Sequence, residues 1–410
     1  MRRLAPLLLA APLLLPLAGC GLNGTDRDTA DKGAPAKTAQ ASAAEDAWVA
    51  DPMASHDPTG SAPLDPAQAD DKPRPIMQAQ VVLDRLGFAP GVVDGKEGMS
   101  TTNAIEGFQK ANELEPTGKL DEKTKQALAA WSNIPATRVV TIPEAFAAES
   151  FTPLPKEPEE QAKLTRLGYE SLDEKLAERF HTTIAVLKEL NPGGVPSGMS
   201  GAEAGSSTPT PSTTSTSKAS GASPTPTPKP SFFRAGQQIR VPNIGGDTID
   251  PAAVDDRDWL ATLTMLGIGT QQPKADKVVV DKSDGTLQVY DASGKLVAQF
   301  TATMGSSHDP LPLGDWKILA AVKNPPFHYN PDLFWDADPS DEKAKLPPGP
   351  NGPVGVVWID LSKEHYGIHG TPNPETIGRA ESHGCVRLTN WDVARLAQMV
   401  SSSTKVSFVA

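Results

Sequence analysis

Apolar and polar residues alternate most regularly in the last third of the chain. Short apolar or alternating runs are separated by turn signals at Asp284-Gly285 and Ser293-Gly294, an arrangement typical of β-hairpins. The strands expected from these runs are 277–281, 287–290, 297–304, 316–319 and 356–359. A closing helix is expected at 391–400, with Asn390 as its N-cap. The pattern predicts a mainly-β sandwich or barrel over residues 274–410.

The apolar spacing changes to a helical period in residues 76–132. Residues 77–86 form the first helical run. Ser100 or Thr101 is the expected cap of a second helix, and Asp121 is the expected cap of a third. This pattern predicts a small three-helix domain, and a generic helical bundle is the alternative.

Residues 169–243 combine helical spacing with one short strand. Helices are expected at 172–180 and 184–190, and the strand is expected at 235–242. Before the strand, residues 196–231 are rich in Ser, Thr, Pro and Gly, a composition that cannot bury a core. We expect a small α+β module interrupted by a disordered, solvated loop. A helical hairpin that only spaces its neighbours is the alternative.

The N-terminus is typical of an exported protein. Arg2 and Arg3 precede an apolar stretch, 4–17, that is too short and too broken by proline to span a bilayer, so residues 1–20 read as a secretory signal. Residues 21–75 have little apolar periodicity and are expected to form a flexible tether.

Leu17-Ala18-Gly19-Cys20 resembles the lipobox of bacterial lipoproteins. The resemblance implies that Cys20 is lipidated and anchors an exported protein to the cell envelope. Gly21, rather than Asp, follows Cys20. By the same resemblance this favours the periplasmic face of the outer membrane in a cell with two membranes.

Composition narrows the class of protein. A length of 410 residues suggests two or three domains. The net charge of −12 without a basic run argues against a nucleic-acid partner. With one of the two cysteines assigned to lipid, Cys385 has no intramolecular disulfide partner.

Cys385 lies in a sequence suited to thiolate chemistry. His369 is sixteen residues before it and His383 is two before it. A free thiol has a pKa near ~8.5, and a nearby histidine can take its proton to leave an ion pair. Gly384 permits close backbone approach, with adjacent N–H groups available to an oxyanion. Arg387 matches the geometry of a substrate carboxylate. An extended strand would place His383 and Cys385 on one face unless Gly384 bends the chain.

These residues carry a resemblance to the YkuD-type L,D-transpeptidase domain, which covers about residues 277–410. The matching motifs are His369-Gly370-Thr371, Ile377-Gly378, Ser382-His383-Gly384-Cys385-Val386-Arg387-Leu388-Thr389-Asn390 and Pro312-Leu313-Gly314-Asp315-Trp316.

Two further segments resemble wall-binding modules. Residues 76–132 resemble the three-helix peptidoglycan-binding domain, through Leu86-Gly87-Phe88, Val93-Asp94-Gly95 and Gly118-Lys119-Leu120-Asp121. Residues 169–243 resemble a LysM module, apart from the interrupting loop.

The resemblance implies an acyl transfer on peptidoglycan stem peptides. The implied roles are nucleophile for Cys385, general base for His369, site-shaping or oxyanion binding for Ser382, His383 and Gly384, and substrate binding for Gly370, Thr371 and Arg387. The thiolate attacks the carbonyl of the third stem residue, D-alanine leaves, and an amine resolves the thioester. No cofactor or metal is implied. Four other histidines lack Cys or carboxylate partners at ligand spacing and are expected on the surface or in loops: His181, His308, His328 and His365.

Two questions stay open from the sequence. One is whether the aromatic residues of the Pro-rich loop 324–353 cover the site as a lid or simply pack together; they are Phe327, Tyr329, Phe334 and Trp335. The other is the fate of the acyl group. Water as acceptor would make the protein a carboxypeptidase or endopeptidase, and a chain without activity would only bind the wall and the membrane.

Overall fold

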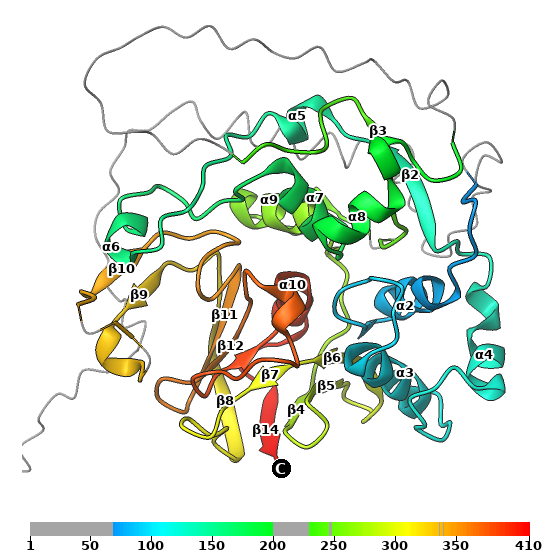
Figure 1. Ribbon diagram of the computed structural model, residues 1–410. Coiled ribbons are helices and arrows are strands. Elements are labelled where there is room, and N and C mark those ends of the chain that lie inside the picture. Colours follow the sequence, from blue (N-terminus) through cyan, green and yellow to red (C-terminus); the bar gives the residue numbers. More distant parts are fainter. Residues whose placement is uncertain (1–68, 200–228, 246–247, 336, 339) are drawn as a thin grey trace, which may run out of the picture.

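The computed structural model describes residues 69–199, 229–245, 248–335, 337–338 and 340–410 (Figure 1). The signal segment, Cys20, most of the expected tether and most of the loop 196–231 lie outside these residues. In the described part of the chain, none of the helices has the length and apolar character that crossing a membrane requires.

The C-terminal part forms the mainly-β domain that the sequence predicts. Its sheet has ten strands in the order β1-β6-β5-β4-β14-β8-β11-β12-β13-β7. The strands are β1 (Phe88–Ala89), β4 (Lys277–Asp281), β5 (Thr286–Tyr290), β6 (Leu296–Thr301), β7 (Thr303–Met304), β8 (Gly314–Lys323), β11 (Val357–Leu361), β12 (Gly367–His369), β13 (Val386–Arg387) and β14 (Lys405–Val409). The last strand, which the sequence analysis missed, lies between β4 and β8 and runs parallel to β4.

Alternating residues of these strands fill the core. Val278 and Val280 on β4, and Leu287 and Val289 on β5, are fully buried. Helix α10 (Asn390–Met399) packs against the same core through Trp391, as the closing-helix prediction requires. Its N-cap was predicted wrongly. The Thr389 side chain accepts the capping hydrogen bond from the Asp392 amide, while the Asn390 side chain is used elsewhere.

The three predicted N-terminal helices are confirmed as α2 (Pro75–Arg85), α3 (Met99–Ala111) and α4 (Glu122–Leu128). Asp121 caps α4 as expected, by accepting a hydrogen bond from the Thr124 amide at 2.9 Å. The cap predicted for α3 was wrong, because α3 begins one residue before Ser100 and follows Gly98 without a side-chain cap. Strand β1, between α2 and α3, pairs in parallel with β6 and extends the main sheet.

The middle part is closed by two paired strands, with the short helices α5 (Glu144–Ala147) and α6 (Pro158–Gln161) and then two longer helices between them in sequence. Strand β2 (Thr137–Thr141) pairs antiparallel with β3 (Gln238–Pro242), and α7 (Leu172–Arg179) and α8 (Ile184–Leu190) lie between them in sequence. Both helices are capped as their sequences suggest, α7 by Ser171 and α8 by Thr183. The sequence analysis missed β2. Because β2 gives the last strand of this region a partner, the region is more than a helical hairpin.

The remaining elements connect these parts. The helices are α5 (Glu144–Ala147), α6 (Pro158–Gln161) and α9 (Arg257–Leu266), and the strands are β9 (Phe327–Tyr329) and β10 (Ala344–Leu346). Short 3₁₀ helices are η2 (Ala129–Trp131), η3 (Pro192–Gly194), η4 (Pro251–Ala253), η5 (Pro331–Leu333) and η6 (Pro374–Thr376).

A buried ionic cluster joins all three parts. The Asp84 carboxylate of α2 receives two hydrogen bonds from the Arg395 guanidinium of α10, at 3.2 and 3.1 Å. The His181 Nδ1 atom lies 3.4 Å from Asp84, its Nε2 lies 2.9 Å from the Leu266 carbonyl oxygen, and its ring stacks on Trp391. His181 was expected on the surface or in a loop. It does lie between two helices, but it is fully buried because three elements close around it.

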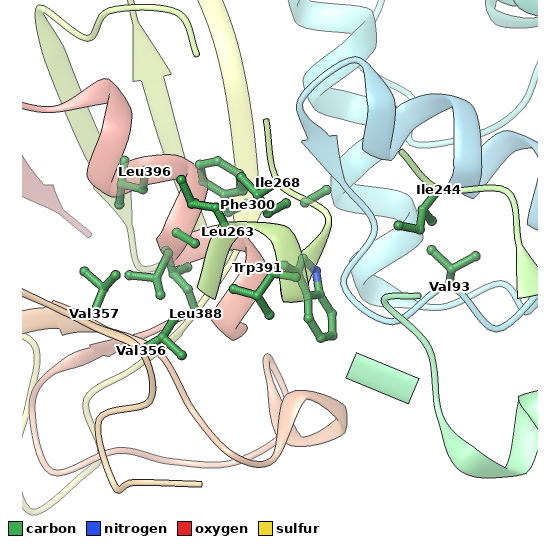
Figure 2. Packing of buried hydrophobic residues seen from close by; sticks show 14 of the residues in the cluster. Val93, Ile244, Leu263, Ile268, Phe300, Val356, Val357, Leu388, Trp391 and Leu396 are labelled. Atoms are coloured by element: carbon green, nitrogen blue, oxygen red, sulfur yellow. The ribbon is translucent and has the colours of Figure 1, made fainter. Parts of the chain in front are cut away.

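One continuous apolar core runs through the same junction. It includes Val93 of the N-terminal helical part, Ile244 after β3, and Trp391, Leu396 and Phe300 of the C-terminal domain (Figure 2). In the described residues, the three parts therefore pack against one another through buried residues of one cluster.

Candidate active site

The site is built where β12 lies beside β13. These two strands run parallel, with the His369 Cα opposite that of Arg387, and β13 pairs on its other side with β7. Cys385 directly precedes β13 and is half-buried. Its thiol donates to the His365 carbonyl oxygen, with an Sγ–O distance of 3.7 Å. The pairing brings the two segments of the motif, sixteen residues apart in sequence, side by side on adjacent strands.

His369 is buried and held in one tautomer. Its Nδ1 lies 2.7 Å from the Gly370 carbonyl oxygen. A carbonyl only accepts hydrogen bonds, so Nδ1 carries the hydrogen and Nε2 keeps a lone pair. The ring also stacks on Trp358, its cross-strand neighbour on β11, with centroids 5.5 Å apart. These two contacts fix the orientation of the imidazole.

The environment of His369 disfavours the imidazolium. Burial and the nearby Arg387 guanidinium lower the pKa of His369 to about 3, against the opposing effect of the Gly370 carbonyl. The geometry therefore fits a neutral histidine at rest, in contrast to the ion pair expected from the sequence, with Nε2 available to take a proton during a reaction.

Ser382 braces the loop before Cys385. Its hydroxyl donates to the Cys385 carbonyl oxygen at 2.6 Å and accepts from the Gly305 amide at 2.7 Å. Gly384 bends this loop at φ +93°, so His383 and Cys385 do not follow one extended strand. A Cβ atom at Gly384 would lie 2.6 Å from the Tyr366 ring. Both the backbone angle and the packing therefore require glycine.

We expect Gly384→Ala to lower kcat/KM by about ten- to a hundredfold, because the Tyr366 ring and the loop must shift to admit the methyl group. The matched control is Gly294→Ala, at a hairpin turn with a positive φ but open space around its Cβ. Steady-state kinetics on both variants, with circular dichroism to check folding, measures the difference. Equal activity of the two variants would contradict the packing argument.

Aromatic residues of the hairpin β9–β10 lie against His383. The Phe334 and Trp335 rings have centroids 5.1 and 5.8 Å from that of His383. Phe327 and Tyr329 pack on Phe334 in turn. His308 stacks on Trp335 at 4.5 Å. The aromatic residues thus pack on one another, as the packing alternative expects, and they also border the Cys385 loop, as a lid would.

The expected substrate-binding residues differ in exposure. Arg387 is part of β13, and its Nη1 lies 3.5 Å from the Glu381 carbonyl oxygen. Thr371 is buried, and its hydroxyl accepts a hydrogen bond from the Asn373 amide. A Cβ atom at Gly370 would lie 2.3 Å from Oδ1 of Asn390. Thr371 and Gly370 therefore shape the site through packing.

Sequence reasoning missed three neighbours of the site. Trp358 reaches His369 only through the strand register, which a single sequence does not reveal. His365 adopts φ +69° and turns its carbonyl to the thiol, and Tyr366 abuts Gly384. Both directly precede β12 and could have been found by their nearness to His369. Among the described residues, no group of three or more His, Cys, Asp or Glu side chains is arranged to hold a metal ion.

Comparisons with known proteins agree with this geometry. The family model "L,D-transpeptidase catalytic domain" matches residues 275–407, and "Putative peptidoglycan binding domain" matches residues 74–128. The chain is 57% identical over 146 residues to the Bacillus licheniformis protein named "Putative L,D-transpeptidase YkuD", covering 36% of this chain and 73% of the relative. The Bacillus subtilis protein of the same name is 55% identical over 58 residues, which is 14% of this chain and 35% of that protein.

A solved structure gives a weaker likeness. The L,D-transpeptidase from Mycobacterium smegmatis is 24% identical, with a TM-score of 0.27, and the match covers 33% of this chain and 59% of that one.

Proposed function

Because the chain belongs to the YkuD-type L,D-transpeptidase family, we propose that it cross-links peptidoglycan through a thioester at Cys385. The observation that carries the proposal is the fixed tautomer of His369, whose Nδ1–H points to the Gly370 carbonyl and leaves Nε2 as the acceptor. A buried neutral base on the strand adjacent to the one that follows a half-buried thiol is what a cysteine acyltransferase needs.

The reaction proceeds in two balanced steps. His369 takes the thiol proton as the sulfur attacks the carbonyl of the third stem residue, and returns it to the departing amine of D-alanine. The C–N bond breaks as the C–S bond forms, which leaves a thioester. A side-chain amine of another stem then attacks the thioester and releases the thiol. His369 receives the proton of this amine and returns it to sulfur.

Other residues of the loop prepare this chemistry. The backbone amides near Gly384 bind the oxyanion, since Gly384 allows a substrate to approach closely. Ser382 holds the Cys385 carbonyl, which orients the peptide that carries the nucleophile. Arg387 attracts the carboxylate of the stem peptide and disfavours protonation of His369. His383, Gly370 and Thr371 shape the pocket.

The middle part is proposed to bind glycan as a LysM-like module. The supporting observation is that the helix pair α7 and α8 precedes β3, which pairs antiparallel with β2. Together with the peptidoglycan-binding domain, this module holds the enzyme on the wall. Lipidation at Cys20 tethers it to the membrane, on the periplasmic face of the outer membrane in a cell with two membranes.

Mass spectrometry of a purified tetrapeptide muropeptide tests the activity. The full chain and its Cys385→Ala variant are incubated with the substrate in parallel. The expected product is a cross-linked dimer that lacks one D-alanine and forms only with the wild type. Loss of D-alanine without a dimer indicates a carboxypeptidase. No change with the wild type contradicts catalysis and favours a protein that only binds the wall.

A further inference from the structure

The hairpin over the candidate site has little core of its own. Strands β9 and β10 form a separate two-stranded sheet. Leu346 is buried, but the other residues of both strands are half-buried or exposed. A two-stranded hairpin is marginally stable by itself in water. Something outside the hairpin must therefore hold Phe334 and Trp335 against His383.

Residues 157–168, which connect α5 to α7, meet the base of this hairpin; we call this segment the strap. The Leu167 amide donates to the Pro348 carbonyl oxygen, and the Leu167 carbonyl oxygen accepts from the Asn351 amide, both at 3.0 Å. The two backbones are so close that a Cβ atom at Gly349 would lie 2.1 Å from the Leu167 oxygen. Leu167 itself is fully buried. The strap thus pairs with the hairpin base much as a short strand would.

Two side chains reinforce this contact. The Asn351 amide group donates to the Gly168 carbonyl oxygen at 3.1 Å and to the Glu174 carboxylate of α7 at 2.6 Å. At the other end of the strap, the Glu159 carboxylate accepts a hydrogen bond from the Glu342 amide, just before β10, at 2.7 Å. Helix α6, which carries Glu159, lies beside β10 (Figure 1). The hairpin is therefore held at both ends of β10 by residues outside the catalytic domain.

We propose that the strap is a positioning element for substrate binding, and that Glu159 and Asn351 act through it on the aromatic residues at His383. The expected change in KM rests on the proposed function, whereas the expected change in the order of the hairpin does not. Ordered Phe334 and Trp335 present a fixed apolar wall to the stem peptide. When the hairpin loosens, only a fraction of the molecules is competent to bind, and KM rises by the inverse of that fraction.

The test compares Glu159→Ala with Glu160→Ala in the full chain. Both residues lie in the first turn of α6, but the Glu160 side chain is exposed and pairs with Lys163 of its own segment. Two readouts are measured. Hydrogen exchange of the peptides that cover 327–346 reports the order of the hairpin. Steady-state kinetics with the tetrapeptide muropeptide reports KM and kcat separately.

In Glu159→Ala we expect hydrogen exchange in residues 327–346 to accelerate by about three- to tenfold, because one charge-assisted hydrogen bond to the hairpin is lost. Exchange in strands β4 and β5 should not change. KM rises by a similar factor, while kcat stays within about twofold. Asn351→Ala provides a second variant with the same expected pattern. Glu160→Ala behaves as the wild type in both readouts.

Unchanged exchange in both Glu159→Ala and Asn351→Ala would overturn the proposal. So would faster exchange with unaltered KM, because the hairpin order would then not govern binding. If the wild type has no activity on the muropeptide, the proposed function fails, but the exchange experiment still decides whether the strap orders the hairpin. The two failures are thus distinguishable.

Discussion

Replacing His369 by glutamine is expected to lower kcat/KM by about 10²- to 10⁴-fold. The carboxamide can keep a hydrogen bond to the Gly370 carbonyl but cannot accept the proton of Cys385 at neutral pH. Iodoacetamide labelling at Cys385, followed by intact-protein mass spectrometry, gives a readout that needs no substrate. We expect it to slow as well, because the thiol loses its base. A variant within about threefold of the wild type in kcat/KM would exclude His369 as the base.

The same substitution changes the dependence of stability on pH. The pKa of His369 is about 3 in the folded protein and near ~6.5 in an unfolded chain. Between these values the unfolded state binds more protons, so His369 makes the free energy of unfolding fall as the pH drops from 6.5 towards 3. The slope from one such group is at most about 1.4 kcal/mol per pH unit. Urea titrations at pH 6.5 and 4.5 should show a smaller loss for His369→Gln than for the wild type, which also establishes that the variant is folded.

The sequence predicts the parts of this molecule that depend on local patterns. The helical runs of α2, α7 and α8 and the hairpin strands β4 to β6 follow from periodicity and turn residues. The nucleophile and base could be predicted because their motif holds reactive residues within a short stretch of sequence. Such features depend on residues that are close together in the chain, so a single sequence contains all the information needed to predict them.

Long-range pairing explains most of what was missed. Strand β2 acquires its partner, β3, from about a hundred residues further along the chain. Strand β1 has only two residues and exists because β6 offers a free edge. The burial of His181 depends on contacts with Asp84 and Trp391, from two other parts of the fold. No local pattern encodes these contacts, since each depends on how separate elements pack.

The second large effect is expected from Asp84→Asn, which we predict to destabilise the protein by about 3–5 kcal/mol at pH 5.5. Burial alone would raise the pKa of Asp84, but the Arg395 guanidinium and His181 hold it well below its usual range. The neutral amide leaves the buried Arg395 without its ionised partner. Because Asp84 lies between the three parts, we also expect one cooperative urea transition for the wild type and a broader or split transition for Asp84→Asn.

The pH dependence of the destabilisation by Asp84→Asn distinguishes an effect of charge from an effect of packing. Asp392 is fully buried near Arg395, and burial together with the Asp84 charge, opposed by Arg395, raises its pKa to about 7. Without the Asp84 charge, the pKa of Asp392 falls, and its carboxylate can serve as the counter-ion of Arg395 at higher pH. In the wild type, Asp392 makes the free energy of unfolding decrease as the pH rises from about 4 to about 7, since the folded state binds more protons.

In Asp84→Asn the free energy of unfolding should decrease less over this pH range than it does in the wild type. The difference in stability between the variant and the wild type should therefore narrow by about 1–2 kcal/mol between pH 5.5 and 8. The double variant Asp84→Leu/Arg395→Met is the matched control. It removes both charges and should be closer to the wild type than Asp84→Asn at pH 5.5, because an apolar pair avoids the cost of a lone buried cation. Equal deficits for Asp84→Asn at both pH values would show that lost packing, rather than an uncompensated charge on Arg395, accounts for the destabilisation.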